Sequence, residues 1–268
     1  MMHANHGAIS RRVAINALLL ACLTLVWLVA VPAFGARGGA AAQPAQSTPD
    51  GEFNRRVREY LLNNPEVVAE ALERLRAREV AAKELAIQST IKARADELLR
   101  DPDSPVGGNA EGNVTLVEFF DYNCPYCRRV APTMTQLMAD DPQLRVAYKE
   151  FPILGPNSLL AAKAALAAQR QDKYVAFHER LMDRKGTVDE KFILSAAAQT
   201  GLDVDRLKTD MKAPEIAAAI QKNIQLARAL GINGTPGFVI GDQIIPGAVG
   251  LGVLKAAVKQ ARANKRIK

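Results

Sequence analysis

The sequence predicts an α/β fold with a long helical insert, preceded by a helical extension. Two apolar runs, 114–120 and 145–151, have the length and the β-branched or aromatic content of core strands. Residues 158–230 carry repeated helix start and stop signals. Residues 51–104 place apolar side chains at helical spacing. With 268 residues, the chain is long enough for one or two domains and a sizeable core.

Residues 1–35 have the pattern of a targeting segment. Arg11 and Arg12 precede an apolar run at 13–31, and small residues at 32–36 offer a cleavage region. The apolar run is nearly long enough to span a bilayer, so an uncleaved anchor is the alternative to a cleaved signal. Both readings predict a periplasmic or otherwise extracytoplasmic protein.

Residues 36–50 are rich in Gly, Ala, Pro, Gln and Ser, which predicts a flexible linker. Cys22 lies in the apolar run and is expected to leave with the signal. The mature chain then holds a single pair of cysteines, which suits an oxidising compartment.

The segment 51–104 is expected to be a helical extension. Asn64 followed by Pro65 marks a helix start. A helix from Pro65 to Arg100 would run roughly 54 Å at about 1.5 Å per residue, longer than a small domain. Because the apolar stripe shifts phase, we expect a break near residues 76–78 and association into a small cyclic homo-oligomer. A helix folded back onto the domain of a monomer is the alternative.

Residues 105–268 are expected to form the α/β domain, with the helical insert at about 157–230. Val106 opens a short first strand, and Gly241-Asp242 marks a hairpin turn between two short apolar runs. Turn residues then lead into a last helix at 251–263. The helices expected in the insert are Leu159–Arg170, Lys173–Arg184, Glu190–Thr200, Val204–Lys212 and Pro214–Leu230.

Two cysteines follow the first apolar run directly, at a predicted strand-to-helix turn. Cys124 would lie near the N-terminus of a helix over 128–138, where backbone N–H groups and the helix dipole stabilise a thiolate. Its pKa should therefore fall. Cys127 lies one turn further in, where it is less exposed. This layout predicts thiol–disulfide exchange, with Cys124 attacking and Cys127 resolving.

Glu118 stands out because it is a carboxylate within the apolar run 114–120. A carboxylate in a core strand is unfavourable unless it is partnered or protonated. On a core strand, Glu118 would lie beneath the cysteine pair with a raised pKa and could exchange a proton with Cys127. The alternative is an edge strand with Glu118 facing solvent.

The motif Cys124-Pro125-Tyr126-Cys127, after its strand, resembles the active site of the DsbA-like branch of the thioredoxin superfamily. Residues 149–155 resemble the end of the next strand in that family, and 234–238 resemble its cis-proline loop. The helical insert lies between them, as in DsbA-like proteins. Residues 60–66 resemble the N-terminal extension of ScsC-type members.

The resemblance implies a thioredoxin fold and a protein thiol:disulfide oxidoreductase or isomerase that needs no cofactor. Pro125 and Tyr126 would tune the cysteine pair. Thr235 would offer backbone groups to an extended substrate, with Pro236 in the cis form opposite the cysteines. The implied partners are unfolded or misoxidised exported proteins and a membrane redox partner. The motif leaves the direction of exchange open, because the reduction potential decides it.

Other classes of function fit the sequence less well. A structural zinc site needs two more ligands than the cysteine pair supplies, so no metal is assigned. The pair could instead hold Cu(I), which prefers soft ligands, and a copper-binding protein is the alternative function. His178 is expected to be a surface or packing residue. The net charge of +7 lacks a basic run interleaved with aromatics, which argues against nucleic acid.

Overall fold

The computed structural model describes residues 49–267. The predicted targeting segment, Cys22 and nearly all of the predicted linker lie outside the described residues. The described chain divides into two compact units between Asn63 and Asn64. The first unit holds helix α1 (Pro49–Asn63), and the second holds all the other elements. The expected extension 51–104 therefore spans both units.

A five-stranded mixed sheet forms the centre of the second unit, in the order β1-β3-β2-β4-β5. The central strand β2 pairs in parallel with β3 and antiparallel with β4, while β1 and β5 occupy the edges. The strands are β1 (Val106–Gly108), β2 (Val114–Phe120), β3 (Leu144–Glu150), β4 (Gly237–Ile240) and β5 (Gln243–Pro246).

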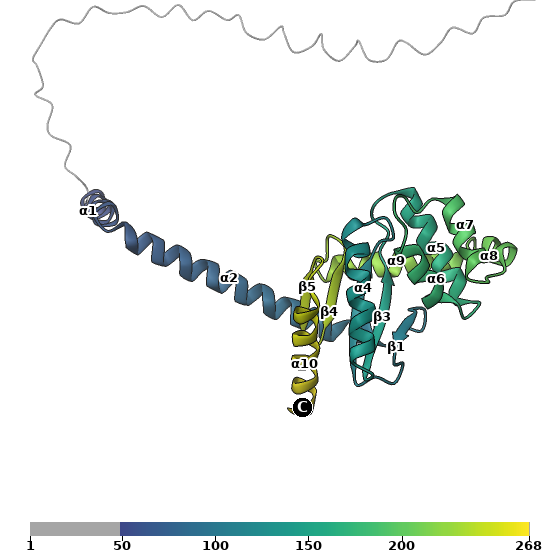
Figure 1. Cartoon of the computed structure of the whole chain (residues 1–268). Helices are drawn as coiled ribbons and strands as arrows, with labels where there is room; N and C mark the ends of the chain where they lie inside the picture. Colours follow the sequence, from purple (N-terminus) through teal and green to yellow (C-terminus); the bar gives the residue numbers. More distant parts are fainter. Residues whose placement is uncertain (1–48, 268) are drawn as a thin grey trace, which may run out of the picture. The chain divides into compact units, whose positions relative to one another are not determined.

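Helices cover both faces of this sheet, which explains why β2 and β3 are almost continuously buried. One face packs against α4 (Pro125–Asp140), α10 (Leu251–Ile267) and helices of the insert. The other face packs against α9 (Pro214–Ala229) and the end of the extension. Figure 1 shows α5 (Pro156–Gln169) to α8 (Val204–Asp210) grouped together, away from α2 (Pro65–Ala93).

The predicted insert is present as five helices between β3 and β4. Each differs from its predicted bounds by three residues or fewer at either end. The N-caps Asp189 and Asp203, and Pro214 at the first position of its helix, are local signals that fix the starts of the last three. The helices are α5 (Pro156–Gln169), α6 (Tyr174–Met182), α7 (Glu190–Gln199), α8 (Val204–Asp210) and α9 (Pro214–Ala229).

The long extension helix α2 (Pro65–Ala93) starts at the predicted residue, with Asn64 as its N-cap. The predicted break near residues 76–78 is wrong: that stretch holds only good helix formers and is continuous helix. The interruption occurs at Arg94, after which the short helix α3 (Ala95–Leu99) follows. Beyond Arg94, Leu98 of α3 packs against the sheet.

Only the C-terminal end of the extension is buried. Ile91 and Leu98 pack with Val117 and Phe119 of β2 in a core cluster on one face of the sheet. Further toward the N-terminus, α2 holds large apolar side chains that are 36–67% exposed, namely Val67, Val68, Leu72, Leu75, Val80 and Leu85. The helix therefore combines an anchored end with an apolar surface uncovered in a single chain.

Candidate functional site

Cys124 is the N-cap residue of α4, with an extended backbone (φ −78°, ψ 118°). The helix begins at Pro125, one turn earlier than the residue predicted from the sequence. Proline suits the first helical position because its missing N–H would have no intrahelical partner there. Backbone groups of Tyr126 and Cys127, in the first turn, help to lower the pKa of Cys124, as the sequence predicted for a thiolate at a helix N-terminus.

The two cysteines have opposite protonation preferences. Hydrogen bonding by the Cys127 thiol is the largest cause that lowers the pKa of Cys124, to about 5, with further help from Thr235 and first-turn backbone groups. Burial raises the pKa of Cys127 well above its usual range. At neutral pH Cys124 is therefore a thiolate and Cys127 a thiol, which is the state required for a nucleophile with a resolving partner.

The cis-proline loop lies directly against Cys124. The Thr235–Pro236 peptide bond is cis, as the resemblance implied. The Sγ atom of Cys124 lies 3.3 Å from the backbone oxygen of Thr235. The backbone N–H of Gly247 donates to the oxygen of Pro236 at 2.8 Å, which connects the loop to the end of β5. The loop thus presents backbone atoms beside the sulfur, where an extended chain could bond.

Glu118 is 3% exposed in the middle of β2, the central strand, so the edge-strand alternative is wrong. Burial raises the pKa of Glu118 to about 8. A negative charge on Glu118 in turn raises the pKa of Cys127. The carboxyl lines a cavity of about 440 Å³ that Arg128 of α4 and His178 of α6 also line. A carboxylic acid with a pKa near neutral therefore lies close enough to Cys127 to affect its protonation.

Pro125 and Tyr126 are both exposed between the cysteines. The guanidinium of Arg129 lies 5.1 Å from the centre of the Tyr126 ring, a cation–π contact. These side chains border the approach to Cys124, while their tuning of the pair stays a prediction.

Sequence reasoning missed the residues that shape the loop before Cys124. Asp121 is buried, and its carboxylate accepts from the backbone N–H groups of Asn123, Ile153 and Leu154 at 2.8–3.0 Å. Asn123 in turn accepts from the N–H of Val188, in the insert, at 2.8 Å. The signal available in the sequence was an Asp-x-Asn pair before a helix, which is typical of side chains that bond nearby backbone.

A second missed group is a buried polar network under the site. Glu150 accepts hydrogen bonds from the hydroxyls of Tyr174 at 2.7 Å and Tyr122 at 3.1 Å. The Tyr122 hydroxyl also lies 3.0 Å from Nδ1 of His178. Burial raises the pKa of Glu150 and lowers that of His178 to about 3. His178 is thus a buried packing histidine, as predicted, and it connects α6 to the active-site loop.

Arg128, directly after the second cysteine, joins the active-site helix to the insert. Its guanidinium donates to the backbone oxygens of Tyr122 at 2.9 Å, Arg184 at 3.0 Å and Gly186 at 2.6 Å. Hydrogen bonds from a charged donor to several carbonyls are stronger than neutral ones. The insert is therefore held against the start of α4.

Within 49–267, no group of three or more His, Cys, Asp or Glu side chains is placed to hold a metal ion. None of the helices in this range combines the length and apolar character needed to cross a membrane.

Comparison with known proteins places this geometry in a family. Residues 115–259 match the family model described as the DSBA-like thioredoxin domain. Residues 52–82 match the model described as the copper resistance protein ScsC N-terminal domain. The first match covers more than half of the chain and includes Glu118, both cysteines and the cis-proline loop.

Solved structures similar to this chain include an oxidoreductase, a thiol-disulfide exchange protein and a ScsC protein. A thioredoxin-like oxidoreductase from Silicibacter pomeroyi is 50% identical, covering 63% of this chain and 97% of its own, with a TM-score of 0.62. Thiol-disulfide exchange protein alpha-DsbA2 from Wolbachia pipientis is 33% identical, covering 67% and 97%, with a TM-score of 0.63. A linker-deletion mutant of Proteus mirabilis ScsC is 33% identical, covering 85% and 100%, with a TM-score of 0.60.

The first curated relatives are much longer proteins. A Na⁺/H⁺ antiporter NhaA 1 from Salinispora arenicola is 30% identical over 171 residues, which are 63% of this chain and 26% of the antiporter. The chain thus spans about a quarter of the length of the first curated relatives it matches.

Proposed function

Because the chain belongs to the DSBA-like thioredoxin domain family, we propose that it exchanges disulfides with exported substrate proteins. The observation that carries this proposal is the contrast between the two cysteines. Cys124 is a thiolate at the N-terminus of α4, while Cys127 beside it is a buried thiol. This combination lets the Cys124 sulfur form a mixed disulfide with a substrate, which the Cys127 sulfur can then resolve.

The proposed oxidation of a substrate proceeds in two balanced steps. A substrate thiolate attacks Sγ of Cys124 in the oxidised protein, the Cys124–Cys127 bond breaks, and Cys127 leaves with the electron pair. A second substrate thiolate then attacks the substrate sulfur of the mixed disulfide and releases Cys124 as a thiolate. The substrate gains a disulfide and the protein becomes a dithiol, so two electrons pass to the protein.

Glu118 is proposed to supply and accept the proton that Cys127 needs. Cys127 leaves as a thiolate in a buried position, where burial strongly favours its protonated form. The Glu118 carboxyl has a pKa of about 8 and is therefore mostly protonated at neutral pH, so it can donate at that moment. In the reverse direction, the carboxylate accepts the same proton when Cys127 attacks.

We propose donation or reshuffling of disulfides, in preference to reduction, as the direction. The low pKa of Cys124 stabilises the reduced form at neutral pH, and stabilising the reduced form makes a disulfide a stronger oxidant. A strongly oxidising potential would favour donation, and an intermediate potential with activity on scrambled substrates would favour isomerisation. The protein would work in the periplasm or a comparable compartment, with a membrane redox partner that resets the pair.

The extension is proposed to join several chains into one oligomer. Helix α2 exposes Val68, Leu72 and Leu75 at intervals of three and four residues, the spacing of a helix-pairing seam. Helix α1 separately exposes Phe53 and Leu62. Association would hold several cysteine pairs at high local concentration around one substrate, which favours reshuffling over simple donation.

The exchange proposal is tested with the mature protein and a reduced, unfolded secreted protein. Mass spectrometry after acid quenching counts disulfides in both partners at successive times. We expect the substrate to gain disulfides as the protein loses its own. A substrate that oxidises no faster than with the Cys124→Ser variant would refute the proposed activity. The reduction potential, measured against glutathione, separates donation from isomerisation.

Cu(I) binding is the second candidate, favoured by the match of residues 52–82 to the copper resistance protein ScsC N-terminal domain. Two thiolates are suitable soft ligands. The close approach of Thr235 to Cys124 opposes it, since the loop occupies one side of the sulfur. Competition with a chromophoric Cu(I) chelator at millimolar glutathione decides this. Tight binding without detectable exchange would replace the enzyme proposal.

A further inference from the structure

A groove of about 600 Å³ runs from the cis-proline loop to the anchored end of the extension. Helix α2 contributes four residues to its lining, namely Lys83, Ala86, Ile87 and Thr90. The apolar side chains of Ile232 and Ile244 also line it, together with Thr235 and Pro236 of the cis-proline loop. Figure 1 shows this end of α2 beside β5. The volume lies within the range of about 300–1,000 Å³ that is usual for ligand sites.

We propose that this groove binds the stretch of substrate polypeptide next to the reacting cysteine, so that the N-terminal extension forms one wall of the substrate site. The inference rests on the proposed exchange function. A substrate sulfur bonded to Cys124 must lie beside Thr235, because the Cys124 sulfur is 3.3 Å from its backbone oxygen. Thr235 also lines the groove, so a chain leaving that sulfur on this side enters it directly.

The lining defines the chemistry of the occupant. Most of it is apolar or backbone, and its only charged side chains are Lys83 of α2 and Arg228 of α9. Both side chains belong to exposed residues, and the lining contains no acidic residue. An extended segment with apolar residues and an acidic one therefore fits best. Apolar contacts would supply the affinity, and charge complementarity would supply the preference for a segment with an acidic residue.

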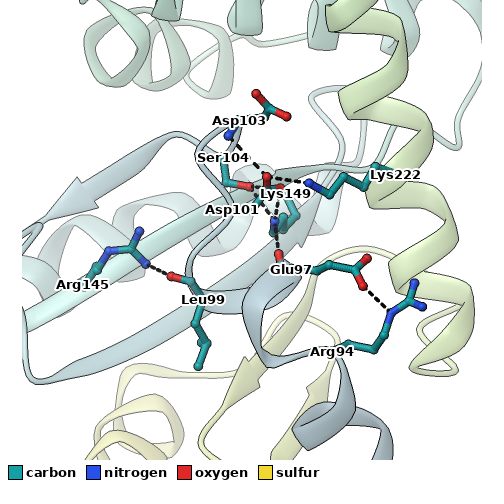
Figure 2. Close-up of polar contacts among 9 residues, drawn as sticks. All are labelled: Arg94, Glu97, Leu99, Asp101, Asp103, Ser104, Arg145, Lys149 and Lys222. Atoms are coloured by element: carbon teal, nitrogen blue, oxygen red, sulfur yellow. Dashed lines mark hydrogen bonds and ion pairs between the residues drawn. The ribbon is translucent and has the colours of Figure 1, made fainter.

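A buried cluster of polar groups holds this wall in place (Figure 2). Nζ of Lys149 in β3 donates to Asp101 Oδ2 at 2.9 Å, to Ser104 Oγ at 2.5 Å and to the backbone oxygen of Glu97 at 2.6 Å. Nζ of Lys222 in α9 donates to the other oxygen of Asp101 at 2.7 Å. We call these residues the anchor cluster.

The anchor cluster and the packing of Ile91 and Leu98 fix the end of the extension to the sheet. The side chains of Lys149 and Asp101 are 0% and 2% exposed, so this ion pair is shielded from solvent. Ile87 packs against the same core cluster from the neighbouring turn of α2. The wall is therefore set at a defined distance from the cis-proline loop, as a binding groove requires.

The test measures release of thionitrobenzoate when reduced, full-length protein attacks two mixed disulfides. One carries an eight-residue peptide with one cysteine, two leucines and one aspartate, and the other carries glutathione. Cys124 bonds to the peptide or glutathione sulfur, and thionitrobenzoate leaves with the electron pair. Since both compounds share a leaving group, the ratio of their rates reports contacts with the peptide. Ala86→Trp, which fills the groove, should lower this ratio at least tenfold.

Ala81→Trp is the matched control, because Ala81 is an exposed alanine of the same helix that does not line the groove. It should leave both rates at the wild-type level. Thermal unfolding by circular dichroism verifies that each tryptophan variant is folded.

Charge reversal provides the second arm. Lys83→Glu combined with Arg228→Glu should invert the preference, so that a peptide with lysine in place of aspartate reacts several-fold faster. The groove proposal is refuted if both Ala86→Trp and the charge-reversed variant keep the wild-type ratio of peptide rate to glutathione rate and react normally with the glutathione compound. That result would leave the proposed exchange function standing. Absence of release from either compound by the wild-type protein overturns the exchange function itself.

Discussion

Lys149 and Glu150 are consecutive in β3, yet their buried side chains serve opposite faces of the sheet. Lys149 pairs with Asp101 on the face that receives the extension. Glu150 accepts from Tyr122 and Tyr174 on the face that carries the cysteines. This follows from the alternation of side chains along a strand. The strand thus joins the anchor cluster to the network beneath the active site.

The anchor cluster should respond unequally to the loss of its two main members. Asp101→Asn leaves Lys149 charged and buried beside neutral partners, and should lower the free energy of unfolding by about 3–5 kcal/mol. Lys149→Met should have a smaller effect, since Asp101 keeps Lys222. The double variant should be more stable than Asp101→Asn alone. Urea unfolding of the four proteins measures this, and equal losses for both single variants would contradict it.

The same cluster predicts a pH dependence. Hydrogen bonds from Lys222 and Lys149 outweigh burial and lower the pKa of Asp101 to about 2. Its stabilising effect is therefore complete above pH 4 and should be lost as the pH falls through 2. The stability difference between the wild type and Asp101→Asn should accordingly shrink over that window.

Cys127→Ser should accumulate mixed disulfides between Cys124 and substrate proteins. The resolving thiol is absent, while Cys124 at the helix N-terminus stays reactive. Non-reducing gel electrophoresis and mass spectrometry of the purified protein after incubation with a scrambled substrate identify the adducts. Cys124→Ser is the control and should trap none. A folded Cys127→Ser protein without adducts would mean that the roles of the cysteines are assigned wrongly.

Alkylation of Cys124 in the reduced protein should be fast at neutral pH and fall with a midpoint near pH 5. The pKa of about 5 means that the thiolate persists down to that pH. The rate with iodoacetamide, followed by mass spectrometry from pH 3 to 9, gives the titration. Cys127→Ala removes the main hydrogen-bond donor and should shift the midpoint upward. A midpoint near 8.5, the ordinary thiol value, would rule out the proposed activation.

Glu118→Gln should slow turnover and also stabilise the protein at neutral pH. The pKa of Glu118 is raised to about 8, so the folded state holds a proton that the unfolded state loses above about pH 4.5. Wild-type stability therefore falls as the pH rises from 4.5 to 8, and the variant lacks this loss. The variant's free energy of unfolding should therefore exceed that of the wild type by on the order of 3 kcal/mol at pH 7, and this difference should vanish below pH 4. An unchanged pH–rate profile would remove Glu118 from the mechanism.

Leu72→Glu together with Leu75→Glu should prevent the proposed association of α2 and leave the protein monomeric. Both side chains are about half-exposed on α2, so the substitutions do not disturb the buried core. Light scattering of the mature protein gives the mass, with Arg76→Glu as a control on the same helix. A wild-type protein that is already monomeric would refute the proposed association.

Point substitutions test the proposed association better than truncation of the extension does. A chain beginning at Ser104 would lose Leu98 from the core and Asp101 from beside the buried Lys149. Such a chain could fail to fold for reasons unrelated to association.

The sequence predicted the features that local patterns encode. The strand before the cysteines and the helix after them follow from neighbouring residues, and the structure confirms both, although the helix begins at Pro125, one turn earlier than predicted. The cis-proline loop was implied by the family resemblance, and the structure confirms it as well. Burial of Glu118 was also predictable, because its strand is apolar on both sides. The position of Cys124 against Thr235 required the family resemblance as well, since the two residues lie 111 positions apart.

The features that were missed depend on contacts between distant segments. Lys149 was identified only as part of a strand, although its partner Asp101 lies 48 residues earlier. Glu150 and Tyr122 likewise meet across 28 residues. The groove combines α2 with a loop about 150 residues away, so no local pattern marks it. The helix break was placed wrongly because the phase of an apolar stripe does not show where tertiary packing bends a helix.

The ion pair of Lys149 with Asp101 bears on how this extension could be transplanted. An engineer who fused residues 51–104 to another thioredoxin-like body would carry Asp101 into it but leave both of its cationic partners behind. The transferred carboxylate would then be buried without a counter-charge. The extension would either stay unattached to the new body or cause it to misfold. A working chimera must also contain a lysine at the position of Lys149 in β3 and another at the position of Lys222 in α9. The modular unit of this protein is therefore defined by three separated stretches of sequence, and a cut at the end of the extension does not isolate it.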